Sequence, residues 1–196
     1  MRKRAIFTVG VLVLVFMWLI PVRSALFARA GEDRRFPAFT TTDLNGETVT
    51  EAVFAESDIT MVKFWTTWCP ACVVEKPTLA ALYNELGGGM IGILLDADGR
   101  GAIENAREIL ETSGVNYPQL RPSQEMQSLL RTVRSIPTAI FVDSRGYIVG
   151  ETIVGSRSHE AYLSAISAAR GSTREHSEHS EQVEAGPDTV YEKDEN

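Results

Sequence analysis

The two cysteines of this chain lie three positions apart, at Cys69 and Cys72 in the segment Trp-Cys-Pro-Ala-Cys, and they are the only two among 196 residues. Thiols at this spacing can form a structural disulfide, ligate a metal ion, or cycle between a reduced dithiol and a disulfide. A purely structural disulfide is disfavoured, because closing so small a loop restricts the unfolded chain very little. A domain of ordinary length can also build its core without a covalent staple.

A metal site lacks ligands in this sequence. Structural zinc takes four ligands, usually from two paired motifs, and the chain has no second cysteine pair. The histidines at His159, His176 and His179 are far from the cysteines in sequence. We therefore expect no metal and no cofactor. Because thiolates suit copper(I), a two-coordinate copper(I) site remains the alternative to redox chemistry.

The sequence around the cysteines favours redox chemistry. The apolar run 59–65 predicts a central strand, and residues 70–86 have the spacing of a helix that ends at three glycines. Cys69 then lies at the helix N-terminus, where free N–H groups and the helix dipole favour a thiolate, and Pro70 suits the first turn. Cys72 lies one turn further along. We expect Cys69 to attack a disulfide and Cys72 to resolve the mixed disulfide.

The other elements predict an α/β domain with a mixed sheet and helices on both of its faces. Asn45-Gly46 within 36–50 is a strong hairpin signal ahead of the first central strand. Pro77 is expected to kink the helix that carries the cysteines. The later elements are expected as strand 90–96, helix 101–114, helix 123–133 with Ser123 as its N-cap, strands 138–143 and 147–155 in a hairpin, and helix 158–169.

The N-terminus has the pattern of an export signal. The basic residues of 2–4 precede the uncharged run 5–20, and a cationic flank stays on the cytoplasmic side, so the rest should be exported. The run is longer than a usual signal core of about 7–15 residues and just short of the roughly 17–25 that span a bilayer. We expect an uncleaved anchor in the cytoplasmic membrane through residues 5–22, with the domain facing the periplasm. Cleavage near Ala30 to a soluble periplasmic form is the alternative.

The C-terminus differs in composition from the rest of the chain. From Gly171 on it has eight acidic and two basic residues and few large apolar ones, so it supplies −6 of the chain's net charge of −7. Such a segment cannot bury enough surface to order itself, and we expect it to be disordered. The chain thus divides into residues 1–30, a domain at 31–170, and a tail at 171–196. The folded part has no basic patch, which argues against nucleic acid as a partner.

Residues 64–77, read as Phe-Trp-Thr-Thr-Trp-Cys-Pro-Ala-Cys-Val-Val-Glu-Lys-Pro, resemble the active-site strand and helix of the thioredoxin superfamily. The preceding hairpin and the apparent anchor narrow the resemblance to the TlpA/ResA-like extracytoplasmic thiol-disulfide oxidoreductases, over roughly 36–170. It implies a thioredoxin-like mixed sheet with helices on both faces, preceded by an N-terminal β-hairpin. The matching features are Trp68, the two cysteines, Pro77, and the Ser-Ile-Pro-Thr segment at 135–138.

The resemblance also implies roles for single residues. It implies that Pro137 follows a cis peptide bond and lies against the dithiol. The backbone beside it, at Ile136, would then pair with an extended substrate segment, with Trp68 at the same site. Glu75, three residues after the second cysteine, is implied to manage protons.

Two further features bear on the dithiol. The residues between the cysteines, Pro70 and Ala71, are expected to tune its potential. Lys63 departs from the pattern, because thioredoxins proper carry an aspartate six residues before the first cysteine and this family often has a neutral polar residue there. We expect Lys63 and Glu75 to point beneath the dithiol and form a partly buried ion pair. The alternative is that the Lys63 ammonium reaches solvent along its apolar stem.

The leading functional hypothesis is an anchored enzyme that reduces disulfides of other exported proteins, including thiol reduction in cytochrome c maturation. An exported compartment is oxidising, so a reductant there needs a membrane thiol-disulfide electron donor. Two alternatives stay open: a disulfide oxidase of the same fold, and a copper(I)-binding dithiol protein.

Overall fold

The computed structural model describes the backbone of residues 34–184 and the side chains of residues 34–173. The predicted anchor or signal segment and its cleavage site lie outside the described residues. Among the helices of the described part, none is long and apolar enough to cross a membrane.

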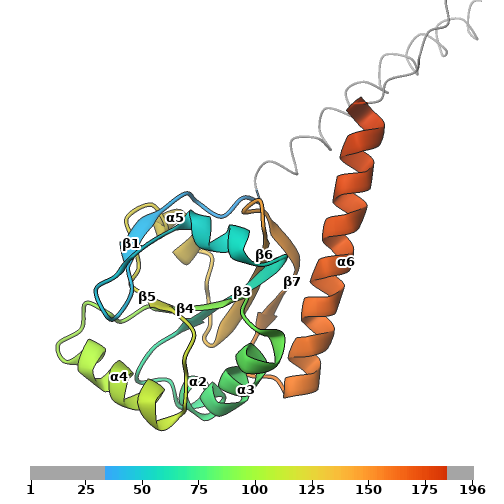
Figure 1. The fold of residues 1–196 in the computed structure, drawn as a ribbon. Helices are drawn as coiled ribbons and strands as arrows, with labels where there is room; N and C mark the ends of the chain where they lie inside the picture. The colour runs from blue at the N-terminus through green and yellow to red at the C-terminus, as the bar shows by residue number, and fades with distance from the viewer. Residues whose placement is uncertain (1–33, 185–196) are drawn as a thin grey trace, which may run out of the picture. The chain divides into compact units, whose positions relative to one another are not determined.

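A five-stranded sheet in the order β5-β4-β3-β6-β7 forms the centre of the domain (Figure 1). The central strand runs parallel to β4, which runs parallel to β5, whereas β6 and β7 are antiparallel to their neighbours. The predicted mixed sheet is therefore confirmed. Its strands are β3 (Ile59–Trp65), β4 (Met90–Leu94), β5 (Gln119–Leu120), β6 (Thr138–Asp143) and β7 (Ile148–Val154).

All seven residues of β3 are buried, because both faces of the sheet are covered. Val62 and Phe64 point to the face that η1 (Glu51–Glu56) and α5 (Gln127–Leu130) cover. The opposite face, with Met61, packs against α3 (Lys76–Leu86) and α6 (His159–Glu184). Near the carboxyl end of β3, α4 (Ala102–Thr112) packs its Ala106 and Leu110 against Trp65. Lys63 falls between Met61 and Trp65 and so faces the α3–α6 side.

The predicted hairpin is present as β1 (Thr40–Thr42) and β2 (Thr48–Thr50), with Thr41 opposite Val49. Gly46 in its turn has φ +93°, a conformation that favours glycine. The hairpin covers the edge of β5: the Leu44 N–H donates to the Gln119 carbonyl at 2.9 Å, and the Arg121 N–H donates to the Thr42 carbonyl at 3.0 Å.

The helix that carries the cysteines breaks into α2 (Pro70–Val74) and α3, with Glu75 ending the first and beginning the second. This break lies two residues before Pro77, whose ring and missing N–H were expected to kink the helix. The break places Glu75 at a change in helix direction.

Two predicted helices differ from the structure. Of the helix expected at 123–133, only α5 is present. Its N-cap is Met126, so the prediction of Ser123 as the N-cap is wrong. Around α5 the segment makes short turns, with Thr132 donating to Leu129 and Val133 to Leu130, because i to i+3 bonds replace the α-helical ladder there.

The last helix is longer than predicted. It continues to Glu184, so residues 171–184 are helical and the expectation of disorder from Gly171 on is corrected for them. After Gly171 the next strong helix breakers in the sequence are Gly186 and Pro187, just beyond the end of the helix.

Candidate active site

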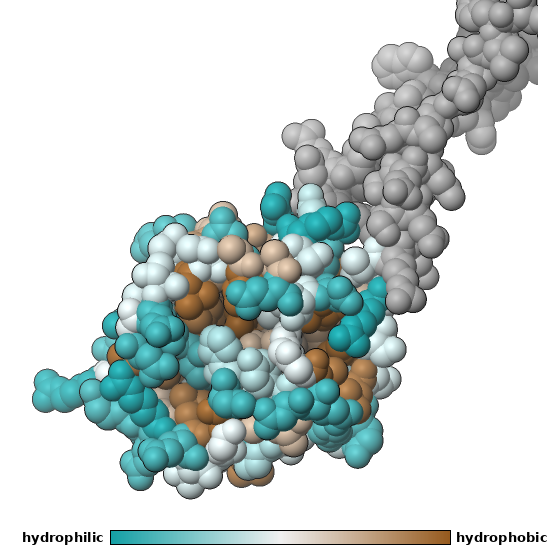
Figure 2. All heavy atoms as spheres, in the orientation of Figure 1, coloured by the Kyte–Doolittle hydropathy of each residue, from teal (hydrophilic) through white to brown (hydrophobic). Residues whose placement is uncertain are grey.

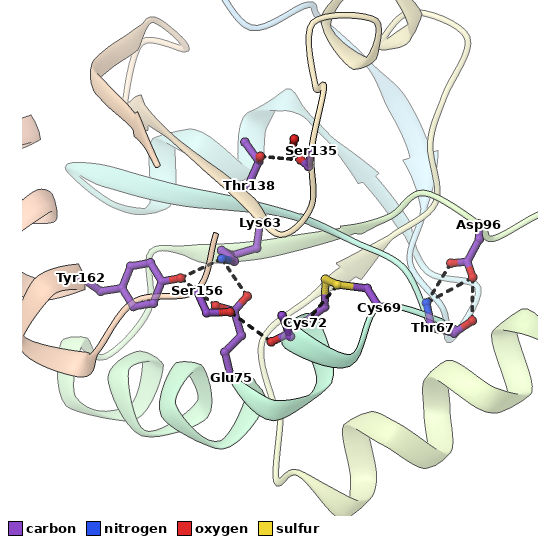
Figure 3. The surroundings of a disulfide bond; sticks show 11 residues. Lys63, Thr67, Cys69, Cys72, Glu75, Asp96, Ser135, Thr138, Ser156 and Tyr162 are labelled. Carbon is purple, nitrogen blue, oxygen red and sulfur yellow. Dashed lines mark hydrogen bonds and ion pairs between the residues drawn. A yellow bond between two sulfur atoms is a disulfide. The ribbon is translucent and has the colours of Figure 1, made fainter. Parts of the chain in front are cut away.

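Cys69 and Cys72 are joined by a disulfide, with their Cα atoms 5.2 Å apart (Figure 3). Cys69 is the N-cap of α2, its sulfur accepts the Cys72 N–H at 3.2 Å, and Pro70 occupies the first turn as predicted. Cys69 is 5% exposed whereas Cys72 is fully buried. Cys69 is therefore the more exposed of the two cysteines, and an attacking group from another protein would reach it before Cys72.

Lys63 and Glu75 form a buried ion pair beneath this disulfide, and the predicted pair is confirmed. The Lys63 Nζ lies 2.8 Å from the Glu75 Oε1, with both side chains almost fully buried. The alternative, a lysine reaching solvent along its stem, is wrong. Burial lowers the pKa of Lys63, and the charge and hydrogen bond of Glu75 oppose that shift.

A third buried residue, Tyr162 of α6, completes this network. Its hydroxyl accepts a hydrogen bond from the Lys63 Nζ at 2.9 Å and donates one to the Glu75 Oε2 at 2.8 Å. Figure 3 shows these three side chains gathered beside the disulfide, each from a different element. Sequence reasoning missed Tyr162, because it follows Glu75 by 87 residues and carries no local motif.

Lys76 is a second buried lysine that sequence reasoning missed. Its Nζ lies 3.5 Å from the ring centroid of Trp65, a cation–π arrangement, and 5.9 Å from that of Tyr117. Burial is the main cause that lowers the pKa of Lys76 to about 7. A signal was available, because spacings of three and four residues place Lys76 on the same helix face as Leu79 and Ala80.

The Trp65 ring over which the Lys76 amine lies is also fixed by a hydrogen bond of its indole nitrogen. Its Nε1 donates to the Gln119 Oε1 at 2.9 Å, and the Gln119 side chain lies over Gly92 on the neighbouring strand. A Cβ at position 92 would overlap that oxygen, so a larger residue there would displace the Gln119 side chain that holds the indole. Burial also raises the pKa of Tyr117, which stays a neutral neighbour of the lysine.

The predicted substrate-contacting residues are Trp68, Ile136 and Pro137. The Ile136–Pro137 peptide bond is cis, and Ile136 packs against the cluster that holds both cysteines. Trp68 is 68% exposed, and Val74, which was not predicted, is 79% exposed. The surface therefore has apolar side chains near the disulfide (Figure 2 shows one face of the molecule, on which brown apolar groups lie among polar ones).

Hydrogen bonds fix the loops on either side of the disulfide. The Thr67 hydroxyl donates to the Asp96 Oδ2 at 2.6 Å, and the Thr67 N–H also points to this carboxylate (Figure 3). On the other side the Ser156 hydroxyl donates to the carbonyl of Ala71, between the cysteines, at 3.1 Å. Neither Thr67 nor Ser156 was predicted.

Within the described part of the chain, no three side chains of histidine, cysteine, aspartate or glutamate come together in a way that could hold a metal ion.

The sequence matches the AhpC/TSA family over residues 33–150. The chain belongs to this family. Its relative, the thiol-disulfide oxidoreductase ResA of Bacillus thuringiensis, is 31% identical over 137 residues, which are 66% of this chain and 75% of that protein.

Solved structures share the fold of this chain. A thiol:disulfide interchange protein of the thioredoxin family from Chlorobium tepidum superposes with a TM-score of 0.59 at 23% identity, covering 69% of this chain and 95% of that one. A secreted disulfide oxidoreductase of Mycobacterium tuberculosis, homologous to DsbE of E. coli, superposes with a TM-score of 0.55 at 20% identity. The match covers 66% of this chain and 95% of that one. The ResA relative makes this family member a thiol-disulfide oxidoreductase of the ResA type, with Cys69 and Cys72 as its CxxC pair.

The buried ion pair of this oxidoreductase leads to a stability prediction. Lys63→Met is expected to lower the free energy of unfolding by on the order of 3–5 kcal/mol, because Glu75 then keeps a buried charge without its counter-ion. Adding Glu75→Gln should recover a large part of that loss. Chemical denaturation of both single variants and the double variant at pH 7 measures the coupling.

The exposed pair of Arg121 and Asp98, 3.3 Å apart, is the matched control. Arg121→Met, Asp98→Asn and their double variant should each change stability by less than about 1 kcal/mol. Simple addition of the Lys63→Met and Glu75→Gln effects would contradict the buried coupling.

Lys76 predicts a dependence of stability on pH. Its folded-state pKa of about 7 lies below the ordinary 10.5, so the unfolded chain binds the extra proton between these values and stability rises with pH across that window. Lys76→Met removes this effect. The variant's free energy of unfolding should exceed that of the native protein by the largest amount at pH 6. This difference should be about 2–3 kcal/mol smaller at pH 9, because each pKa unit corresponds to about 1.4 kcal/mol.

Urea denaturation at both pH values provides the measurement, with Arg170→Met, which removes an exposed positive charge, as the control. A gain that is equal at pH 6 and pH 9 would show that Lys76 is as charged in the folded protein as in the unfolded one.

Proposed function

We propose that this oxidoreductase exchanges disulfides with cysteine-containing exported proteins, and that it acts on them as a reductant. The observation that carries the proposal is the asymmetry of the dithiol: Cys69, at a helix N-terminus, is 5% exposed, whereas Cys72 is fully buried one turn before Glu75. That asymmetry gives one sulfur the attacking role and the other the resolving role. The exposed Trp68 and the backbone at Ile136, beside Pro137, offer a surface for an extended client segment.

The reaction has two steps. The Cys69 thiolate attacks one sulfur of the client disulfide, forms a mixed disulfide and releases the other client sulfur as a thiolate. Cys72 then gives its proton to Glu75 and its thiolate attacks the Cys69 sulfur. This forms the Cys69–Cys72 disulfide and releases the second client thiolate, which takes a proton from solvent. The client gains two electrons and the enzyme loses two.

The charges beneath the dithiol support the reducing direction. A strong disulfide oxidant has a stabilised reduced form, because its attacking sulfur is held as a thiolate. Here Glu75 matches the charge of Lys63, and Lys76, with a pKa of about 7, carries only part of a charge near neutral pH. The layer therefore has little excess positive charge with which to stabilise a thiolate.

The proposal places the domain outside the cytoplasm. Its support is the basic start and uncharged run of residues 5–22, which we propose anchor the protein in the cytoplasmic membrane, with cleavage near Ala30 as the alternative. A reductant in that oxidising compartment needs a membrane thiol-disulfide electron donor to restore its dithiol. Apocytochrome thiols in cytochrome c maturation are one class of client that fits.

The two cysteines are expected to behave differently. Cys72→Ser should accumulate mixed disulfides with disulfide-bearing clients, because the resolving thiol is missing, whereas Cys69→Ser should accumulate none. In the reduced protein, iodoacetamide at mildly acidic pH should label Cys69 first. Non-reducing gels and peptide mass spectrometry provide the measurements. Labelling of Cys72 ahead of Cys69 would reverse the proposed roles.

The direction of the reaction is tested by the reduction potential. Equilibration with glutathione or dithiothreitol buffers should give a value near that of a reductase, about −270 mV, and not near the roughly −120 mV of a strong oxidase. Catalysis of insulin reduction, with copper(I) titration of the dithiol in parallel, distinguishes the enzyme from a copper-binding protein.

A further inference from the structure

The hydroxyl of Tyr162 is the one group, among the described residues, that contacts both members of the buried ion pair. Lys63 and Tyr162 contact different oxygens of the Glu75 carboxylate, at 2.8 Å for Oε1 and 2.8 Å for Oε2. The Lys63 Nζ also donates to the Tyr162 oxygen at 2.9 Å, which closes a three-membered ring of contacts. The ring joins β3, the α2–α3 break and α6.

The donors in this ring fix the direction of each hydrogen bond. A lysine ammonium only donates, so the Tyr162 oxygen must accept from Lys63. The single proton of the hydroxyl then points to Glu75. Because burial raises the pKa of Tyr162, that proton stays on the hydroxyl through the physiological range. Tyr162 is thus a fixed donor to the carboxylate and not a proton acceptor.

We propose that Tyr162 is a positioning residue for disulfide exchange, which orients Glu75 and favours its ionised form so that the carboxylate can take the proton of Cys72. A carboxylate has about four lone-pair positions, and Lys63 and Tyr162 occupy one on each oxygen. The remaining positions can accept a proton. Cys72 precedes Glu75 by three residues, a spacing that places two side chains on one helix face.

This proposal rests on the proposed role of Glu75 as a proton acceptor. Several other groups interact electrostatically with that carboxylate or with its two partners. Lys63 on β3 and Lys76 on α3 are cationic neighbours, and Glu75 also interacts with Tyr117 ahead of β5. Arg157, which precedes α6, acts on Lys63 and Tyr162. None of these groups is changed by Tyr162→Phe, which removes one hydroxyl and keeps the ring.

The test isolates the step in which Cys72 attacks. Reduced enzyme is mixed with increasing oxidised glutathione, and glutathione release is followed between pH 5 and pH 8.5. At saturating glutathione the first step no longer limits, so the plateau rate reports the resolving step. For Tyr162→Phe the pH midpoint of that plateau rate should rise by about one to two units. The reason is that the ionised carboxylate loses a hydrogen bond, and such a bond to a charged group shifts a pKa by about one to two units.

The matched control is Tyr117→Phe. The Tyr117 hydroxyl is also buried and neutral, but unlike the Tyr162 hydroxyl it makes no hydrogen bond to Glu75 or Lys63, so its removal should leave the midpoint unchanged. In a Glu75→Gln background, Tyr162→Phe should have no further effect on the midpoint. A Tyr162→Phe variant that melts earlier but keeps the native midpoint would overturn the positioning role and leave Tyr162 as a packing residue.

The outcomes separate this inference from the proposed function. If the native enzyme does not exchange with glutathione, the proposed function fails. If Glu75→Gln keeps the native midpoint, the proton-accepting role of Glu75 fails, and the inference about Tyr162 fails with it. If only Glu75→Gln moves the midpoint, the inference about Tyr162 fails alone.

A second variant tests the proposal if Tyr162→Phe does not fold. Site-specific 3-fluorotyrosine at position 162 keeps the hydroxyl and makes it a stronger donor at nearly the same size. The midpoint should then move down, opposite to the effect of Tyr162→Phe. An unchanged or raised midpoint would contradict the proposal.

Discussion

The buried ion pair between Lys63 and Glu75 is the interaction on which the rest of the site depends. Either charge alone in this layer would be strongly destabilising, and each is tolerated because the other lies 2.8 Å away. The pair ties the central strand to the break between α2 and α3. It therefore fixes the direction of the helix whose first turn holds the disulfide.

The second buried lysine shows how this layer limits its excess charge. Lys76 follows Glu75 in sequence but points to the other side, onto the ring of Trp65. Burial lowers the pKa of Lys76, so two lysines and one glutamate can share a buried layer without a full unbalanced charge. Gln119 and Gly92 support this arrangement from the neighbouring strands, because they hold the indole against which the amine lies.

Local patterns in the sequence could predict much of the fold and the reactive part of the site. The run at 59–65 matches β3 residue for residue, and the cysteine spacing with Pro70 placed the disulfide at a helix N-terminus. The pair of Lys63 and Glu75 could be inferred because both residues flank the same motif. Tyr162 could not, because its contact with Glu75 forms only when α6 packs on the sheet.

The elements that sequence reasoning missed or misjudged share a dependence on distant parts of the chain. The two residues of β5 are a strand only because β4 and the N-terminal hairpin bond to them. The segment around α5 contains helix formers, yet it forms short turns anchored by the buried Met126. In α6 the helix continues to Glu184, beyond Ala169, which is the last buried residue among those of α6 whose side chains the structure describes.

The ionisation of Glu75 tests the central claim most directly. Protein labelled with ¹³C at the glutamate side-chain carboxyl, with Glu75→Gln for assignment, can be compared with Lys63→Met at pH 6 by NMR. The account predicts an ionised carboxylate in the native protein and a shift toward the protonated acid in Lys63→Met, where burial has no adjacent lysine to oppose it. A Glu75 carboxyl that is equally ionised in both proteins would contradict the claim that Lys63 holds its charge beneath the dithiol.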